Sequence, residues 1–196
     1  MIIFIAMLIV AGLTTSVIIQ TMGDLQETAM KTSSETIRDI STGLKVTHVS
    51  GYNNGSTITQ LAIFIMPIAA SQDIDLKYGY ISLSDSTKKI ILNYSDNCFS
   101  SGAPNGLFHT LNTSNLTSTT YGIMVVRDVD DSCSSVNPVI NDGDLVVLLI
   151  NTTMCFSGID TRTDVNGMVY PEDGIGGVVG FTTPSIYSKT IIDLQP

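Results

Sequence analysis

MIIFIAMLIVAGLTTSVIIQTMGDLQETAM, residues 1–30, opens the chain and decides the fold. No charged side chain occurs before Asp24, and no proline occurs before Pro67. Sixteen of residues 1–22 are Met, Ile, Phe, Ala, Leu or Val. Nineteen residues at about 1.5 Å rise form a helix of roughly 28 Å, which is long enough to span a bilayer. A cleaved secretory signal would be shorter and would begin with basic residues. The stretch therefore predicts a hydrophobic helix that needs an apolar environment.

The helical pattern continues beyond the apolar run. Met22, Leu25, Ile37 and Ile40 are spaced so that they share one helical face, and polar residues fill the positions between them. We expect the helix to fill residues 1–43 and to end at a glycine cap. Such a helix would be roughly 65 Å long, which is too long to be buried inside a small globular domain.

Residues 44–196 follow a different pattern, with short strand-like runs separated by turn signals such as Asn53-Asn54-Gly55. The polar stretch Ser95–Thr120 is predicted to be a surface loop. The chain is therefore predicted to be α+β, with a long N-terminal hydrophobic α-helix and an all-β sandwich or barrel-like head. The candidate strands are Lys45–Val49, Thr57–Met66, Gly79–Ser84, Lys88–Tyr94, Tyr121–Arg127, Asp144–Asn151, Gly167–Tyr170, Gly177–Thr182 and Ser188–Leu194.

Composition and motifs exclude several classes of function. The net charge of −9 argues against a nucleic-acid partner, which would require a basic face. No hydrolase, metalloprotease or nucleotide-binding signature occurs, and His48 and His109 have no patterned partner. The glycine-rich run at 174–180 misses the dinucleotide-binding spacing and indicates a tight turn before a buried strand.

The three cysteines form no CxxC pair and are not at zinc-ligand spacing to a histidine. Cys98, Cys133 and Cys155 are interpreted as buried small apolar residues. A Cys98–Cys133 disulfide across a loop is the alternative, and it would imply an oxidising exterior.

Aspartates cluster in two motifs, RDVDDS and NDGD. Asp128 and Asp130 follow one candidate strand, whereas Asp142 and Asp144 precede another. If these strands pair in antiparallel fashion, both motifs lie at the same edge of the sheet. Carboxylate oxygens converging there are the ligands that Ca²⁺ prefers, so the two motifs form a candidate cation site, whereas solvated turn residues are the favoured interpretation.

Five asparagines begin an N-x-[ST] sequon, which is a mild excess for this composition. Sequons are glycosylated only where the head faces a compartment with an oligosaccharyltransferase. The candidate N-linked sites are Asn54, Asn93, Asn112, Asn115 and Asn151. Asn112 and Asn115 are the preferred acceptors because they lie in the polar loop.

A half-hydrophobic helix followed by a β head is the plan of type IV pilin-like subunits, and four segments narrow the resemblance. IIFIAMLIVAG at 2–12 closely resembles the hydrophobic start of archaeal flagellins, or archaellins. TGLKV at 42–46 resembles their helix-to-strand junction. NDGDLVVLLIN at 141–151 and FTTPSIYSKTIIDLQ at 181–195 resemble their C-terminal strands.

The resemblance implies that helices of many copies pack side by side in the core of a helical filament. Before assembly the helix would rest in the membrane, after a prepilin-type peptidase has removed a basic leader. The filament would lie outside the cell, with other archaellins, the archaellum motor and assembly machinery as further partners, and an oligosaccharyltransferase would attach the N-linked glycans. The expected core residues are Ile2, Ile3, Phe4, Ile5, Met7, Leu8, Ile9, Val10, Leu13, Val17, Ile18, Ile19, Met22 and Leu25.

Two other classes share parts of this pattern. An adhesive type IV pilin-like subunit would have the same helix, but its head would be expected to expose aromatic or basic patches, and only 7% of residues are aromatic. A membrane-anchored enzyme or binding domain would need converging polar groups, which no motif supplies. We therefore predict a non-enzymatic structural subunit of the archaeal flagellum that needs no cofactor, with Ca²⁺ as a candidate ligand and with N-linked glycans.

Overall fold

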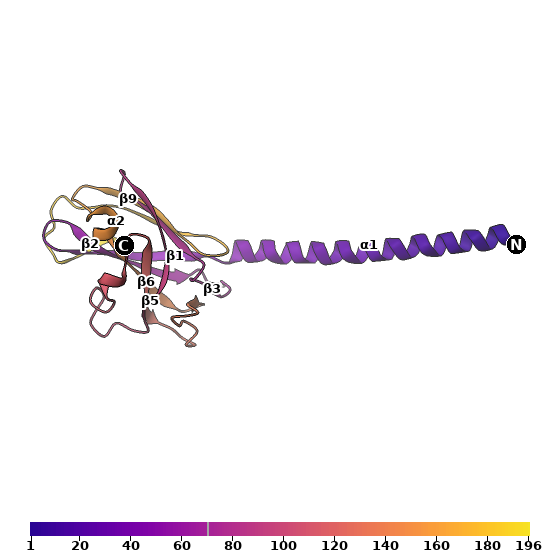
Figure 1. Cartoon of the computed structure of the whole chain (residues 1–196), viewed down its shortest axis with the longest axis horizontal. Coiled ribbons are helices and arrows are strands. Elements are labelled where there is room, and N and C mark those ends of the chain that lie inside the picture. The colour runs from indigo at the N-terminus through magenta and orange to yellow at the C-terminus, as the bar shows by residue number, and fades with distance from the viewer. Residues whose placement is uncertain (70) are drawn as a thin grey trace. The chain divides into compact units, whose positions relative to one another are not determined.

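The computed structural model describes residues 1–69 and 71–196. The chain forms two compact units, residues 1–38 and residues 39–196, and we call the second unit the head. Figure 1 shows one uninterrupted helix in the first unit and a set of strands in the head, where the C-terminus also lies.

The N-terminal helix is confirmed. Helix α1 runs from Ile2 to Ser41, a length of 40 residues. It ends at Ser41, but Gly43 is not among the glycines with a positive φ, so the prediction of a left-handed glycine cap at that residue is wrong. Gly43 instead forms a parallel β-bridge with Ile175. A Cβ at residue 43 would lie 2.8 Å from Ile68 Cδ1 and 3.0 Å from the Ile175 carbonyl oxygen, so close approach of two backbones requires the glycine.

All nine predicted strands occur in the head; Gly177–Thr182 has the predicted bounds, and the other eight have shifted ends. The sequence did not predict the two-residue strands β3 and β7, the short helix α2 or the 3-10 turn. The elements are β1 (Leu44–Asn53), β2 (Ile58–Pro67), β3 (Ile74–Asp75), β4 (Tyr80–Ser84), β5 (Lys89–Ser100), the 3-10 turn (Thr113–Asn115), β6 (Thr120–Arg127), β7 (Val139–Ile140), β8 (Leu145–Asn151), α2 (Thr152–Phe156), β9 (Asp164–Tyr170), β10 (Gly177–Thr182) and β11 (Ile191–Gln195).

One nine-stranded sheet dominates the described part of the head, in the order β10-β9-β4-β5-β6-β8-β2-β1-β11. Its two edge strands approach each other, because the Gln195 side chain accepts from the Gly180 amide at 2.9 Å and donates to the Val178 carbonyl at 3.4 Å. Ile175, which lies just before β10, also accepts a hydrogen bond from the amide of Leu44 in β1. The fold is therefore nearly a closed barrel rather than a sandwich of two sheets.

Strands β6 and β8 are buried on both faces of the sheet, as their continuous buried runs show. Alternate residues enter two separate apolar clusters. Val146, Leu148 and Ile150 belong to the main core, whereas Val147 and Leu149 belong to a second cluster. Because both faces must be covered, the sheet needs a layer outside the main core.

The connection between β5 and β6 supplies that layer. These two strands pair in parallel, whereas the other pairs among the described strands are antiparallel. A parallel pair requires a long crossover connection. Phe108, Leu111 and Leu116 in this crossover are buried in the second cluster. The prediction of a surface loop at Ser95–Thr120 is therefore wrong in two respects, because β5 continues to Ser100 and the loop covers the sheet.

Replacement of Phe108 by Ala should destabilise the head by about 3–5 kcal/mol, because it leaves a cavity in the second cluster. Denaturant unfolding of the head measures this change. Asn105→Ala, an exposed position in the same crossover, is the matched control and should change the free energy of unfolding by less than about 0.5 kcal/mol. Equal, small effects of both substitutions would show that the crossover is not part of the core.

Candidate assembly surface

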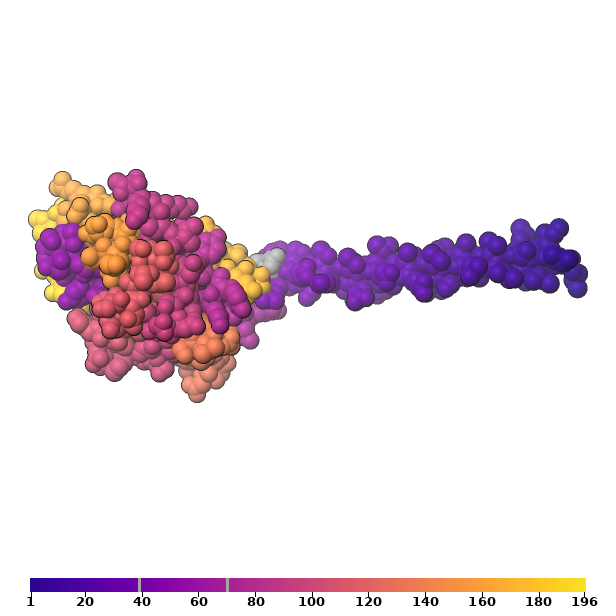
Figure 2. All heavy atoms as spheres, in the orientation of Figure 1, coloured from indigo at the N-terminus to yellow at the C-terminus, as the bar shows by residue number. Residues whose placement is uncertain are grey.

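The most prominent surface of the described chain is α1 itself. All fourteen predicted core residues are at least 55% exposed, with Ile9 at 58% and Leu25 at 69%. On the face of this helix that the space-filling view shows, side chains project into the surroundings along the helix (Figure 2). The helix is long and apolar enough to cross a membrane by length and composition. The structure thus presents an apolar cylinder that its own chain leaves uncovered.

Hydroxyl groups within this cylinder are satisfied locally. Thr15 donates to the Ala11 carbonyl at 2.8 Å, and Thr21 donates to the Val17 carbonyl at 2.7 Å. Such bonds to the preceding turn remove the cost of placing a hydroxyl in an apolar medium. Threonine is therefore compatible with this helix even when water is excluded.

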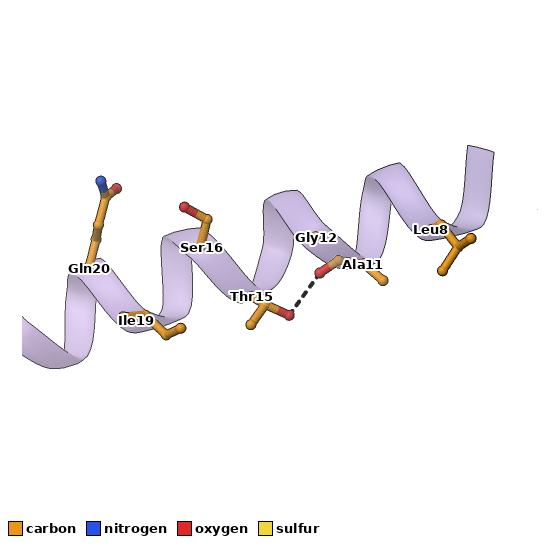
Figure 3. A pocket seen from close by; sticks show the side chains of 7 residues that line it. All are labelled: Leu8, Ala11, Gly12, Thr15, Ser16, Ile19 and Gln20. Atoms are coloured by element: carbon orange, nitrogen blue, oxygen red, sulfur yellow. Dashed lines mark hydrogen bonds between the residues drawn. The ribbon is translucent and has the colours of Figure 1, made fainter. Parts of the chain in front are cut away.

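One face of α1 carries a strip of small residues that the list of predicted core residues omitted. Figure 3 shows this strip, with the Thr15 hydrogen bond drawn. Small residues at spacings of four let helix backbones approach closely, so the spacing in the sequence was an available signal. The strip consists of Ala11, Gly12, Thr15 and Ser16 between Leu8 and Ile19.

The aspartate motifs converge as predicted, with one exception. Strands β6 and β8 pair in antiparallel fashion, which brings Asp128, Asp130 and Asp144 together with carboxylate oxygens within 4.8 Å of one another. Asp142 is not part of this group and lies exposed on the turn before β8, so its inclusion is corrected. Gly143 beside it has a φ of 97°, which turns the chain between the two aspartates.

Backbone amides hold these carboxylates in place. Asp144 is buried and accepts from the amides of Val129 at 3.0 Å and Asn141 at 2.9 Å. Asp128 accepts from the Cys133 amide at 3.0 Å. The cluster therefore combines fixed oxygen atoms with mutual repulsion, a combination that a hard cation would relieve.

Asp130 is the exposed member of the cluster. It accepts from the Ser132 amide at 3.2 Å and from the Asn141 side chain at 2.6 Å. Hydrogen bonding by Ser132 and Asn141 lowers the pKa of Asp130 below its usual value. Asp130 therefore stays ionised in mild acid.

The candidate sequons differ in how free their side chains are. Asn54, Asn93, Asn112 and Asn115 are exposed, whereas Asn151 is half-buried. Asn151 caps α2 by accepting from Met154, and its amide nitrogen donates to the Thr113 carbonyl at 3.1 Å. A glycan on that nitrogen would break its hydrogen bond to the Thr113 carbonyl in the crossover, so Asn151 is the least suitable glycan acceptor.

The cysteines are buried and free, so the alternative Cys98–Cys133 disulfide is not formed in the structure. Cys98 lies in the second cluster and Cys133 in the main core. Burial raises the pKa of Cys133 to about 12 and that of Cys155 to about 11. These thiols stay protonated at neutral pH and act as small apolar residues.

Comparison with known proteins identifies the class. Residues 1–181 match the archaeal-type flagellin family. Flagellin B2 of Methanocaldococcus jannaschii is 41% identical, and the alignment covers 100% of this chain and 92% of that protein. Flagellin B4 of Pyrococcus abyssi is 38% identical, with 100% and 95% covered.

Solved structures agree with this assignment. The crystal structure of archaeal flagellin FlaB1 from M. jannaschii matches with a TM-score of 0.71 and 37% identity, covering 79% of this chain and 97% of that one. A subunit of the archaeal flagellum of Methanospirillum hungatei shares the fold, with a TM-score of 0.67 and 16% identity over 97% of this chain and 95% of that one.

The long apolar helix and near-barrel head therefore define a subunit of a surface filament. The chain belongs to the archaeal-type flagellins. Members of this family are structural subunits of a motility filament and not enzymes. The alternative of an anchored enzyme is thereby excluded, and that of an adhesive pilin is not supported.

Proposed function

We propose that this chain polymerises with copies of itself through α1, which forms the core of the filament. The observation that carries the proposal is the exposure of all fourteen predicted core residues on that helix. Burying each of them is worth roughly 1.5–3 kcal/mol before the costs of ordering. Side-by-side packing of many such helices supplies the apolar surroundings that no part of a single subunit supplies.

The geometry of such packing follows from the same helix. Contacts between unlike faces of neighbouring helices generate an open helical polymer when the rotation from one copy to the next does not close into a ring. The strip from Ala11 to Ser16 lets two backbones approach closely at one of these contacts. Before assembly, a lipid bilayer can surround the apolar side chains of α1. The helix is stable there because its backbone polar groups are hydrogen-bonded to one another.

Further partners belong to this proposal. A prepilin-type peptidase would process the precursor, and archaellum assembly and motor proteins would insert and turn the filament at the cell surface. Other archaellins with similar helices are compatible neighbours in the core. The filament itself would act mechanically, transmitting torque through packed helices without chemistry in the subunit.

Replacement of Ile9 by Asp should abolish assembly, because an unpaired carboxylate in the filament core costs several kcal/mol. Removal of residues 1–38 should leave a soluble, monomeric, folded head. Sedimentation and electron microscopy measure both outcomes, and Ile9→Leu is the matched control that keeps an apolar side chain and should assemble. Filaments formed by the Asp variant or by the isolated head would contradict the helix-core proposal.

We also propose that the aspartate cluster holds a divalent cation, with Asp128, Asp130 and Asp144 as ligands. Three converging carboxylates within 4.8 Å support a hard, oxygen-binding ion such as Ca²⁺. Such an ion would tie the end of β6 to the start of β8 and thereby stiffen this corner of the head.

Ca²⁺ should raise the melting temperature of the head, corresponding to about 2.7 kcal/mol when its concentration is a hundred times the Kd. Asp128→Asn should remove the effect, whereas Asp142→Asn, outside the cluster, should retain it. Thermal melting with Ca²⁺ or a chelator provides the measurement. Identical curves at millimolar Ca²⁺ would leave the aspartates as turn residues held by backbone amides.

We further propose that at least two sequons carry N-linked glycans, with Asn112 and Asn115 the best acceptors. Both are exposed, and glycans there would project from the crossover into solvent. Intact-mass measurement of native protein should give a mass above that of the bare chain. Removal of both asparagines should lower it by discrete glycan masses, and a native mass equal to the bare polypeptide would contradict the proposal.

A further inference from the structure

The outer face of strands β10, β9, β4 and β5 carries large apolar side chains. In the cross-strand register, Val178 opposes Met168, Met168 opposes Ser82, and Ser82 opposes Ile91. Tyr80 opposes Tyr170 in the next row. Val178 is 60% exposed, Ile91 is 55% exposed and Tyr80 is 39% exposed. We call Val178, Met168, Ile91, Tyr80 and Tyr170 the apolar band.

The band breaks the alternation expected of a sheet that faces water on one side. The adjoining row follows the rule, since Asn166, Ser84 and Lys89 oppose one another there. In the band, by contrast, the Tyr80 and Tyr170 rings stack with centroids 4.6 Å apart. Rings held by each other lose little freedom when a partner covers them, which suits a contact surface.

The distribution of charge on the head also favours this face as a contact surface between heads. Most of the net charge of −9 lies in the head, because residues before 39 contribute only Asp24, Glu27, Lys31, Glu35 and Arg38. The band contains no Asp, Glu, Lys or Arg. Two heads of like charge repel, so contact between them is least costly where no charges meet.

The band is continuous with the point where the chain enters the head. A Cβ on Gly176 would lie 3.1 Å from Met168 Cγ, so the segment before β10 lies against the band. Ile175 in that segment is 54% exposed, donates to the Thr42 carbonyl at 3.0 Å and accepts from Leu44 at 2.8 Å. Thr42 and Leu44 directly follow α1, so the band begins beside the root of the helix that assembles.

Filament geometry forces heads together at that root. Packed helices lie about 8–10 Å apart, whereas a head of this length has a radius of gyration of roughly 15 Å. Heads attached to neighbouring helices are therefore wider than the spacing of those helices. We propose that the apolar band is the surface through which one head docks on the head of a neighbouring copy in the filament.

This inference rests on the proposed polymerisation and adds a second contact to it. The contact is heterologous, because a polar helical polymer brings unlike surfaces of successive copies together. Asn93 opposes Tyr80 at the margin of the band, so the docking surface and a glycan on Asn93 exclude each other. The docking proposal therefore predicts that Asn93 carries no glycan.

The test compares a double variant, Ile91→Lys with Val178→Lys, against Met154→Lys with Ile186→Lys in the full chain. The control residues are 58% and 76% exposed and lie outside the band. The measurement is the concentration of free subunit in equilibrium with filaments. We expect the band variant to raise it by about tenfold or more, up to loss of filaments, and the control to leave it unchanged.

A second pair, Ile91→Thr with Val178→Thr, keeps β-branched residues in the strands and should raise the free-subunit concentration in the same direction. Circular dichroism of each variant establishes that the head is folded. Free-subunit concentrations equal to the control in both band variants, or a glycan found on Asn93, would overturn the docking proposal. Failure of the helix-core proposal is distinct, because it would appear as assembly of Ile9→Asp.

Discussion

The rest of the structure depends on one constraint, namely that the apolar surface of α1 cannot be buried by its own chain. Ile9, at the centre of the apolar run, is 58% exposed, and no charged residue interrupts the run before Asp24. Water is a poor solvent for such a surface, so the helix is stable either in a bilayer or among other helices of its kind. The local hydrogen bonds of Thr15 and Thr21 make both environments acceptable. Polymerisation is thus the consequence of a surface that a single subunit leaves open.

The head solves the opposite problem, because it must stay soluble while many copies crowd around the core. Its sheet nearly closes, and the Gln195 side chain bridges to the backbone of β10, so the edge strands offer few free groups for uncontrolled pairing. The crossover from β5 to β6 covers the outer face of the central strands. The acidic surfaces of neighbouring heads repel each other. The apolar band carries no charged side chain, so contact between heads is least costly there.

Features that depend on local pattern were predictable from the sequence, whereas features that depend on distant partners were not. Hydropathy predicts α1, and turn residues separate the nine strands that were found. The role of Gly43 depends on Ile175, which is remote in sequence and lies against it in the fold. The sequence placed Phe108 in a predicted surface loop, because its burial depends on a sheet face that is built from other strands. The aspartate hypothesis depended on antiparallel pairing of β6 and β8, which the structure has, but the inclusion of Asp142 failed because the turn at Gly143 separates it from Asp144.

Methionine oxidation in native filaments tests the central claim most directly, because the chain carries its own reporters. Met7 and Met22 lie on α1, whereas Met154 lies on the head and is 58% exposed. Oxidation converts accessible methionine to the sulfoxide, and peptide mass spectrometry locates it. The account predicts that peroxide oxidises Met154 in intact filaments while Met7 and Met22 remain protected. Oxidation of Met7 and Met22 at the rate of Met154 would show that α1 is exposed to water in the filament and would contradict the account.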